Sequence, residues 1–102
     1  MKNKLLLATL ACIASLVPPA LAQDVNTGRN LAAACAICHG TNGANAGGLP
    51  NIAGQPSDYL ARQMRDFRDG KRAATIMHQI SKGYTDQQID LLASYFAAQK
   101  AK

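Results

Sequence analysis

The sequence has few residues with which to build a hydrophobic core. It contains no tryptophan, and aromatic residues make up only 5% of its 102 positions. Residues 23–102 hold 18 large apolar side chains apart from cysteine, and alanine supplies 14 further apolar positions. Domains of this size usually depend on a disulfide, a metal or a cofactor in addition to their own core. The scarcity argues against a large enzyme with a deep pocket built from protein alone, and it predicts that a non-protein group completes the core.

Strand patterns, repeats and linkers are also missing from the sequence. No segment alternates apolar and polar residues over the length of a strand, no stretch repeats, and no linker divides the chain. A length of 102 residues is enough for one domain and too short for two. We therefore expect a single all-α domain.

The only long hydrophobic run, Leu5–Val17, lies near the N-terminus. Two lysines precede it, and Ala20-Leu21-Ala22 follows it as a small-x-small cleavage pattern. A membrane-spanning helix needs about 20 apolar residues, so this run is too short to serve as an anchor. We expect a cleaved signal peptide of bacterial type over residues 1–22, and a mature domain over residues 23–102 that resides in the periplasm and does not span the membrane.

The first part of the mature chain predicts a helix followed by a long loop. Residues 24–36 are rich in alanine, and Asp24 or Asn26 is positioned to cap that helix. Gly28 lies inside it, where glycine costs about 1 kcal/mol relative to alanine unless another helix approaches closely. Residues 40–54 combine five glycines with three asparagines and a proline, which is typical of a loop. A loop of this length in so small a domain needs something to wrap around.

Two further helices and a short helical turn are predicted downstream. The first of these helices is capped by Ser57 and ends at Gly70 in the C′ position. The turn spans Met77–Lys82. The last helix opens with a T-x-x-Q capping box at Thr85–Gln88. It places four apolar residues on one stripe: Ile89, Leu92, Ala93 and Phe96.

Cys35, Cys38 and His39 form a C-x-x-C-H motif, which is typical of covalent c-type haem attachment. Two thiols three residues apart on a helical turn can add to the two vinyl groups of one haem, and the adjacent histidine then supplies the proximal imidazole. A thioredoxin-like motif would need a βαβ context, and a zinc site would need a fourth ligand, for which only His78 is available. A disulfide between the two cysteines would close only a tiny loop and would leave His39 unexplained. We therefore predict one covalent haem c, attached through Cys35 and Cys38, with His39 as an iron ligand.

Three residues could supply the distal ligand on the other side of the iron. Met64 lies on the apolar stripe of a predicted helix, where methionine is more often part of the core. Met77 lies where an irregular stretch meets a helical turn, and Met/His ligation suits electron carriers. His78 would give a bis-histidine iron, or would otherwise be an exposed side chain beside the ligand. The pattern favours Met77 as the second iron ligand, and Met64 and Ile76 are expected to line the haem.

Residues 24–99 resemble the class I cytochromes c, first through the C-x-x-C-H motif and then through the residues around it. The resemblance implies three main helices and a short one wrapped around one haem. It also implies that the carbonyl of Pro50 accepts a hydrogen bond from the proximal His39, that Met77 is the distal ligand, and that Tyr95 is the aromatic residue where the terminal helices cross.

Two longer stretches resemble narrower groups of that family. Leu49–Pro56 and Phe67–Arg72 are similar to the cytochrome c4-like group, and residues 74–86 are similar to the cytochrome subunit of flavocytochrome c sulfide dehydrogenase. In the latter group, the haem subunit takes electrons from a flavoprotein that oxidises sulfide. The resemblance therefore implies an electron-transfer subunit that docks on a flavoprotein sulfide dehydrogenase subunit or another redox protein.

The alternative is a free electron carrier between a dehydrogenase or bc complex and a terminal oxidase or reductase. A catalytic haem, as in a peroxidase, would need an open coordination position, which Met77 would close. Nucleic acid is not expected as a partner of an exported chain with this motif. We therefore expect an electron-transfer protein that is not an enzyme on its own.

Basic residues are concentrated in the middle of the chain, which has a formal net charge of +5 and no glutamate. The cluster is either a solvated helix face, partly balanced by three neighbouring aspartates, or a docking patch that steers an acidic partner. Its members are Arg62, Arg65, Arg68, Lys71 and Arg72.

Overall fold

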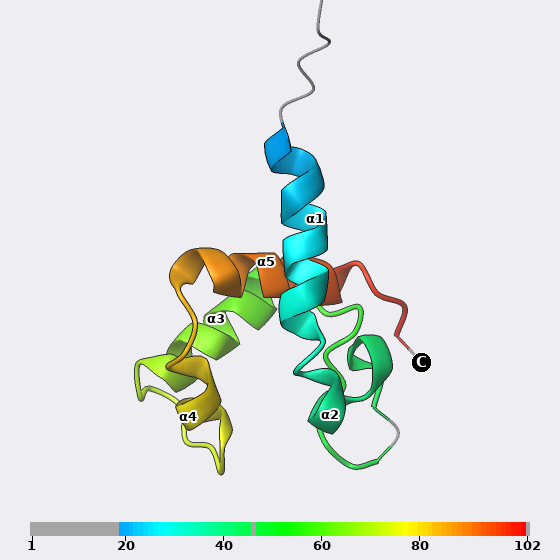
Figure 1. Ribbon diagram of the computed structural model, residues 1–102. Helices are drawn as coiled ribbons and strands as arrows, with labels where there is room; N and C mark the ends of the chain where they lie inside the picture. Colours follow the sequence, from blue (N-terminus) through cyan, green and yellow to red (C-terminus); the bar gives the residue numbers. More distant parts are fainter. Residues whose placement is uncertain (1–18, 46, 102) are drawn as a thin grey trace, which may run out of the picture.

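The structure, a computed structural model, describes residues 19–45 and 47–101 (Figure 1). Within these residues it contains helices and connecting loops but no strand, which confirms the all-α prediction. The helices are α1 (Pro19–Ala32), α2 (Ala36–His39), the 3-10 helix η1 (Thr41–Gly43), α3 (Ser57–Arg68), α4 (Met77–Ser81) and α5 (Asp86–Ala97).

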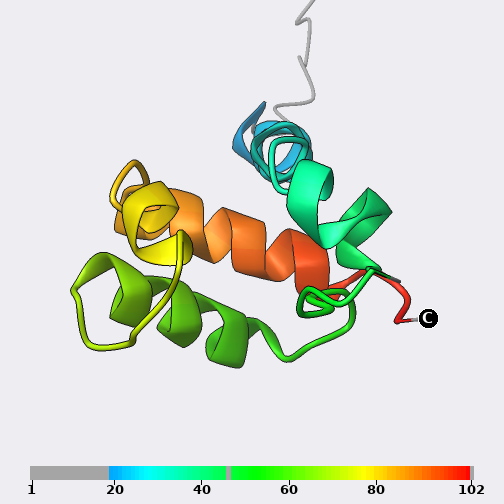
Figure 2. The ribbon, with the colours of Figure 1, turned by 90° about the horizontal axis from the view of Figure 1, so that it is seen from below.

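The C-terminal helix α5 is the central element of the fold. Both α1 and α3 pack against α5, and α4 packs against α3. Figure 2 shows α5 running between α1 and α3, with the two short helices α4 and α2 toward its opposite ends. The fold therefore holds α2, which carries the C-x-x-C-H motif, and α4, which carries Met77, on two different sides of the molecule.

Gly28 lies where α1 crosses α5 (Figure 1). An added Cβ at this buried position would lie 3.0 Å from the carbonyl oxygen of Leu91 and 3.5 Å from the Cβ of Tyr95. The expected close approach of another helix at Gly28 is therefore confirmed, and Tyr95 lies at this crossing. The close backbone contact offsets the cost of glycine inside a helix.

The predicted features of α5 are all present. The Thr85 hydroxyl accepts a hydrogen bond from the N–H of Gln88 (3.2 Å), and the Gln88 side chain accepts one from the N–H of Thr85 (3.0 Å), which completes the capping box. Burial of each large apolar side chain on the stripe contributes about 1.5–3 kcal/mol to folding. The buried residues of α5 are Ile89, Leu92, Ala93 and Phe96.

The start of α3 differs from its prediction. Ser57 is the first helical residue rather than the cap, and the N-cap position is occupied by Pro56, which makes no side-chain capping bond. Pro56 has an extended backbone, and its carbonyl oxygen accepts the first intrahelical bond from Leu60 (3.0 Å). The predicted Ser57 cap is thus wrong because the fixed φ of the preceding proline already leads the chain into the helix.

Gly70 ends α3 as predicted. Its φ of +74° lies in the left-handed region that favours glycine. Its N–H donates to the Phe67 carbonyl (3.3 Å), and the N–H of Lys71 donates to the Asp66 carbonyl (2.8 Å). This pair of bonds is a Schellman motif, which satisfies carbonyl groups at the end of the helix.

The first helix begins and ends earlier than predicted. It begins at Pro19, since proline is tolerated in the first turn of a helix, and Asp24 and Asn26 therefore lie inside α1 and do not cap it. It ends at Ala32, where the N–H of Cys35 donates to the Ala32 carbonyl (3.0 Å) in a turn that separates α1 from α2.

Most of the expected signal peptide, residues 1–18, lies outside the described residues, and its last four residues form the first turn of α1. In the part of the chain that the structure describes, every helix is too short or too polar to cross a membrane.

Candidate haem-binding site

The C-x-x-C-H motif occupies the turn before α2 and α2 itself. The carbonyl oxygen of Cys35 accepts hydrogen bonds from the N–H groups of Cys38 (3.2 Å) and His39 (2.9 Å). Both thiols are free; Cys35 is half-buried and Cys38 is exposed. Burial raises the pKa of the Cys35 thiol above its ordinary value. A single helical turn thus brings two thiols and an imidazole together.

The imidazole of His39 is held in place by the loop that follows it. Its Nδ1 lies 2.8 Å from the carbonyl oxygen of Pro50. Because a carbonyl oxygen can only accept a hydrogen bond, Nδ1 carries the proton and Nε2 is left as the basic nitrogen. Metal-binding histidines commonly donate their second ring N–H to such an acceptor, which orients the ring and raises the basicity of the ligand nitrogen.

The loop that carries Pro50 is anchored to α5. Gly43, with φ +78°, lies so close to Ile52 and Phe96 that an added Cβ would be 2.6 Å and 2.8 Å from their side chains. The Gly43 carbonyl accepts the N–H of Ile52 (3.0 Å), and the N–H of Gly54 donates to the Phe96 carbonyl (2.9 Å). The position of the acceptor for His39 therefore depends on the end of α5.

A second contact links α5 to the start of the same loop. The Tyr95 hydroxyl donates to Oδ1 of Asn42 at 2.7 Å. Asn42 belongs to η1, so the prediction of residues 40–54 as a loop without helix is wrong for Thr41–Gly43. Sequence analysis placed Tyr95 only at the helix crossing. A partly buried tyrosine hydroxyl usually has a hydrogen-bond partner, and this tendency was the available signal for the contact.

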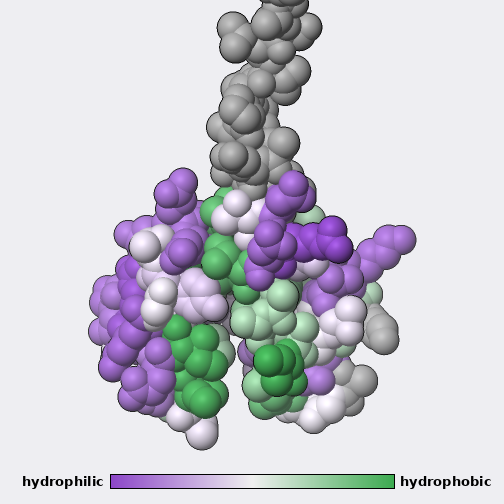
Figure 3. All heavy atoms as spheres, in the orientation of Figure 1, coloured by the Kyte–Doolittle hydropathy of each residue, from purple (hydrophilic) through white to green (hydrophobic). Residues whose placement is uncertain are grey.

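A hollow separates the side of the molecule that carries α2 from the side that carries α4. Figure 3 shows this hollow with hydrophobic residues along both of its sides. Three large apolar residues on these two sides are exposed. Ile37 belongs to α2, Ile76 directly precedes α4, and Ile80 belongs to α4. An apolar opening bordered by the C-x-x-C-H helix suits a flat, largely apolar cofactor.

Met77 and His78 belong to α4, which Figure 1 shows on the opposite side of the molecule from α2. Both are half-buried. The Nδ1 atom of His78 is buried and has no hydrogen-bond partner among the described residues, so His78 is not the exposed neighbour considered from the sequence. The placement of Met77 suits a distal ligand, and this role stays a prediction.

Met64 lies on α3, which packs against both α4 and α5. Its side chain is partly buried and packs against both hydrophobic clusters of the core, one around Leu92 and Phe96 and the other around Ile89 and Ala93. These contacts are those of a core residue. A haem contact of Met64, like that of Ile76, stays a prediction.

The residues around the hollow match the chemistry of haem c rather than that of a zinc ion. In the described part of the chain, no three side chains of His, Cys, Asp or Glu form a group that could hold a metal ion. Two free thiols and an oriented imidazole on one short helix are, by contrast, the donors that covalent haem attachment requires. Cys35 and Cys38 would hold the haem, and Nε2 of His39 would face its iron.

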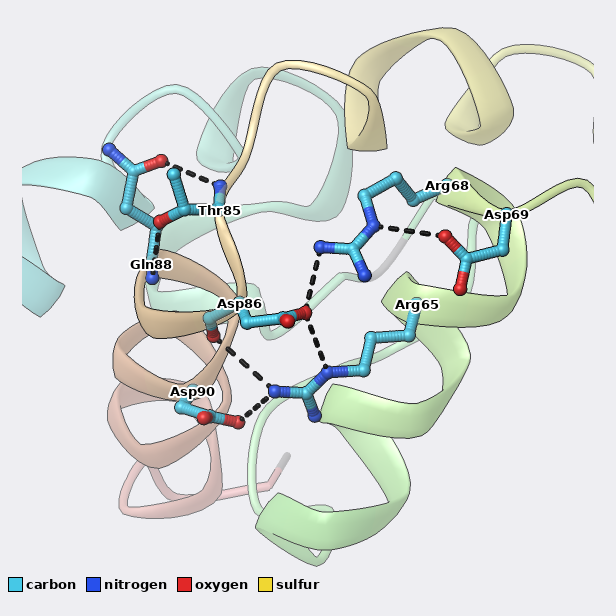
Figure 4. Close-up of polar contacts among 7 residues, drawn as sticks. All are labelled: Arg65, Arg68, Asp69, Thr85, Asp86, Gln88 and Asp90. Atoms are coloured by element: carbon cyan, nitrogen blue, oxygen red, sulfur yellow. Dashed lines mark hydrogen bonds and ion pairs between the residues drawn. The ribbon is translucent and has the colours of Figure 1, made fainter.

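Two arginines of the basic cluster belong to an ion-pair network between α3 and α5 (Figure 4). Arg65 contacts Asp86 (3.2 Å) and Asp90 (2.7 Å). Arg68 contacts Asp69 (3.1 Å) and Asp86 (2.8 Å). These hydrogen bonds from Arg68 and Arg65 lower the pKa of the Asp86 carboxyl below its ordinary value. The cluster predicted from the sequence is therefore divided, because Arg65 and Arg68 join two helices.

Comparison with known proteins places these features in a family. The chain matches the cytochrome c family over residues 25–100. It is 41% identical over 69 residues to the cytochrome subunit of sulfide dehydrogenase of Chlorobaculum tepidum, which covers 68% of this chain and 63% of that protein. It is 38% identical over 99 residues to cytochrome c4 of Pseudomonas aeruginosa, covering 96% of this chain and 49% of that protein. It is 41% identical over 71 residues to the thiosulfate dehydrogenase electron acceptor of Thiomonas intermedia, covering 68% and 33%.

The chain thus spans less than two thirds of the length of these relatives, although the match covers nearly all of its described residues. Cys35 and Cys38 stand in the C-x-x-C-H position at which this family attaches its haem. The all-helical architecture agrees with the class I fold expected from the resemblance. The chain therefore belongs to the cytochrome c family of electron carriers, whose cofactor is a covalently bound haem c.

Proposed function

We propose that this chain is a periplasmic monohaem cytochrome that transfers single electrons as the haem subunit of a flavocytochrome c sulfide dehydrogenase. The observation that carries the electron-transfer part is the hydrogen bond from His39 to Pro50, since it fixes the imidazole of the C-x-x-C-H motif and leaves its Nε2 free to bind a haem iron. When bound, the haem supplies the one-electron couple of its iron.

The residues of the chain have separate tasks in this proposal. Cys35 and Cys38 would hold the haem through thioether bonds, and His39 would be one iron ligand. Met77 on α4 would be the other, which would leave no open coordination position for catalysis. Ile76 and Met64 would line the haem and help to keep water away from it.

The assignment as a sulfide dehydrogenase subunit is supported by the 41% identity to a protein of that name. The periplasmic location is supported by the export pattern of residues 1–22. In this setting the cytochrome accepts electrons one at a time from a flavoprotein partner and is not itself the catalytic subunit.

The second candidate is a diffusing electron carrier. The specific observation in its favour is the equal identity, 41%, to a relative named as the electron acceptor of thiosulfate dehydrogenase. A free carrier would use the same haem site and would differ only in how long it stays with its partner.

Purification of the protein from its native source distinguishes the two candidates. For the subunit, we expect a flavoprotein to co-elute on a sizing column and sulfide to reduce the haem of the complex. A monomeric cytochrome without flavin, which sulfide does not reduce, would support the free carrier. A protein that lacks a covalent haem altogether would overturn both.

A further inference from the structure

The segment Lys71–Lys82, which we call the α4 ridge, projects beside the hollow. It comprises the connection from α3 and the helix α4, and Figures 1 and 2 both show these two parts side by side at the edge of the molecule. Ile76 is 57% exposed and Ile80 is 39% exposed, although both are large and apolar. On this side of the hollow, Figure 3 shows hydrophobic residues along the opening and hydrophilic residues farther out.

The charges on the α4 ridge are all of one sign. No acidic residue occurs between Asp69 and Asp86. Lys71, Arg72 and Lys82 are exposed, and within the described residues none of them takes part in an ion pair. Arg65 and Arg68 of α3 are paired with aspartates, whereas the three cations of the ridge, like the exposed Arg62 on α3, remain available to a partner.

The basic end of the ridge is held in place by the fold. The Asp66 carbonyl accepts the N–H groups of Lys71 (2.8 Å) and Arg72 (3.2 Å). The Arg72 guanidinium lies 5.0 Å from the centre of the Phe67 ring, within the range of a cation–π contact. A cation that is already positioned loses little conformational entropy when a partner binds.

We propose that the α4 ridge is the surface on which the acidic face of a redox protein docks, beside the hollow where electrons leave or enter. This inference rests on the proposed electron-transfer function. Lys71, Arg72 and Lys82 steer the encounter, and Ile76 and Ile80 form the dry centre of the contact. Lys82 lies outside the basic cluster predicted from the sequence, and the absence of acidic residues between positions 69 and 86 was the signal for it.

The test compares two charge reversals in the haem-loaded protein. The first variant is Arg72→Glu/Lys82→Glu on the ridge. The matched control is Arg29→Glu/Lys100→Glu, which changes the net charge equally at exposed positions on α1 and near the C-terminus. The probe is reduced flavodoxin, an acidic flavoprotein, and stopped-flow absorbance gives the second-order rate constant of haem reduction across a range of ionic strength.

We expect the ridge variant to lose about tenfold in rate at low ionic strength, and the control to lose less than about twofold. Ile76→Ser, which keeps every charge, is expected to lower the rate at high ionic strength, where steering is screened. Equal losses in the ridge and control variants, or no loss in the ridge variant, would overturn the proposal. Binding of the wild type to phosphatidylglycerol vesicles that is lost in the ridge variant would assign the surface to an anionic membrane and would also overturn it.

The visible spectrum and the reduction potential of each variant separate this proposal from the proposed function. If the haem of a variant is intact and dithionite reduces it, a rate constant that contradicts the docking proposal bears on the ridge alone and leaves the electron-transfer function standing. If no flavoprotein co-purifies from the native source, the subunit assignment fails, while the flavodoxin measurement still tests the ridge.

Discussion

The imidazole Nδ1 of His39 donates a hydrogen bond to the carbonyl oxygen of Pro50, 2.8 Å away and 11 residues later in the chain. Neither residue determines this contact alone. The chain around the contact is held by Gly43, which lies between the two residues and close to the Phe96 side chain, and by Gly54, which follows Pro50 and bonds to the Phe96 carbonyl. The orientation of the proximal ligand thus depends on the last helix of the domain.

Replacement of Gly43 tests this dependence. In Gly43→Ala, the new Cβ would lie 2.6 Å from the Ile52 side chain and 2.8 Å from the Phe96 side chain, so these side chains or the loop must shift. We expect a loss of about 1–3 kcal/mol in the free energy of unfolding and a changed reduction potential, because the acceptor of His39 moves. Gly48→Ala is the control, since Gly48 also has a positive φ but has open space around it. Denaturant unfolding and redox titration of both haem-loaded variants give the comparison, and equal losses would contradict the role of Gly43.

Met77→Ala tests the distal ligand. We expect loss of the sulfur–iron absorption band near the red end of the spectrum and a lower reduction potential, because a thioether ligand raises the potential of a haem iron. Met64→Leu is the control: it should keep the band, since Met64 packs in the core and leucine nearly conserves its volume. An unchanged band in Met77→Ala would transfer the ligand role to Met64 or His78.

Single replacements of the cysteines test the covalent attachment. Cys35→Ser and Cys38→Ser should each leave one thioether bond or a chain that fails to fold, and mass spectrometry of the denatured protein shows which. Ile37→Ala changes the exposed residue between them and should retain both thioethers. A Cys35→Ser/Cys38→Ser protein that stays folded without haem would refute the argument that the cofactor completes the core.

The ion-pair network predicts a pH dependence. Arg68 and Arg65 lower the pKa of Asp86 in the folded protein, so the ionised carboxylate stabilises the fold at pH values above its unfolded pKa, about 3.9. This contribution is lost as the pH falls through the lower, folded pKa. In Asp86→Asn, the free energy of unfolding should therefore fall less between neutral and acid pH than in the wild type. Asp58→Asn, which removes an exposed acid outside the network, should keep the wild-type dependence, and identical curves for all three proteins would disprove the contribution of Asp86.

Local signals predicted the elements whose structure depends on neighbouring residues. The capping box at Thr85, the buried stripe of α5 and the Gly70 terminus all follow from residues within one or two turns. The haem motif was equally readable, because its two thiols and its imidazole are adjacent in the sequence.

Contacts between residues far apart in the sequence were not predicted, and the start of α3 was predicted wrongly. Arg65 and Arg68 are paired with aspartates about 20 residues away on α5, and that distance hides the pairing in the sequence. The same is true of Tyr95 and Asn42, which are 53 residues apart. The start of α3 was misjudged because Pro56 replaces the side-chain cap that Ser57 suggested.

The contact at Gly28 joins the first helix of the domain to the last. Gly28 and Leu91 are 63 residues apart, so this contact closes a long loop, and the entropic cost of closing a loop grows only slowly with its length. Cys35 and Cys38 lie near the beginning of that span, and α5 lies at its end. The packing of α5 against α1 therefore joins the two ends of the segment that carries the haem-attachment motif.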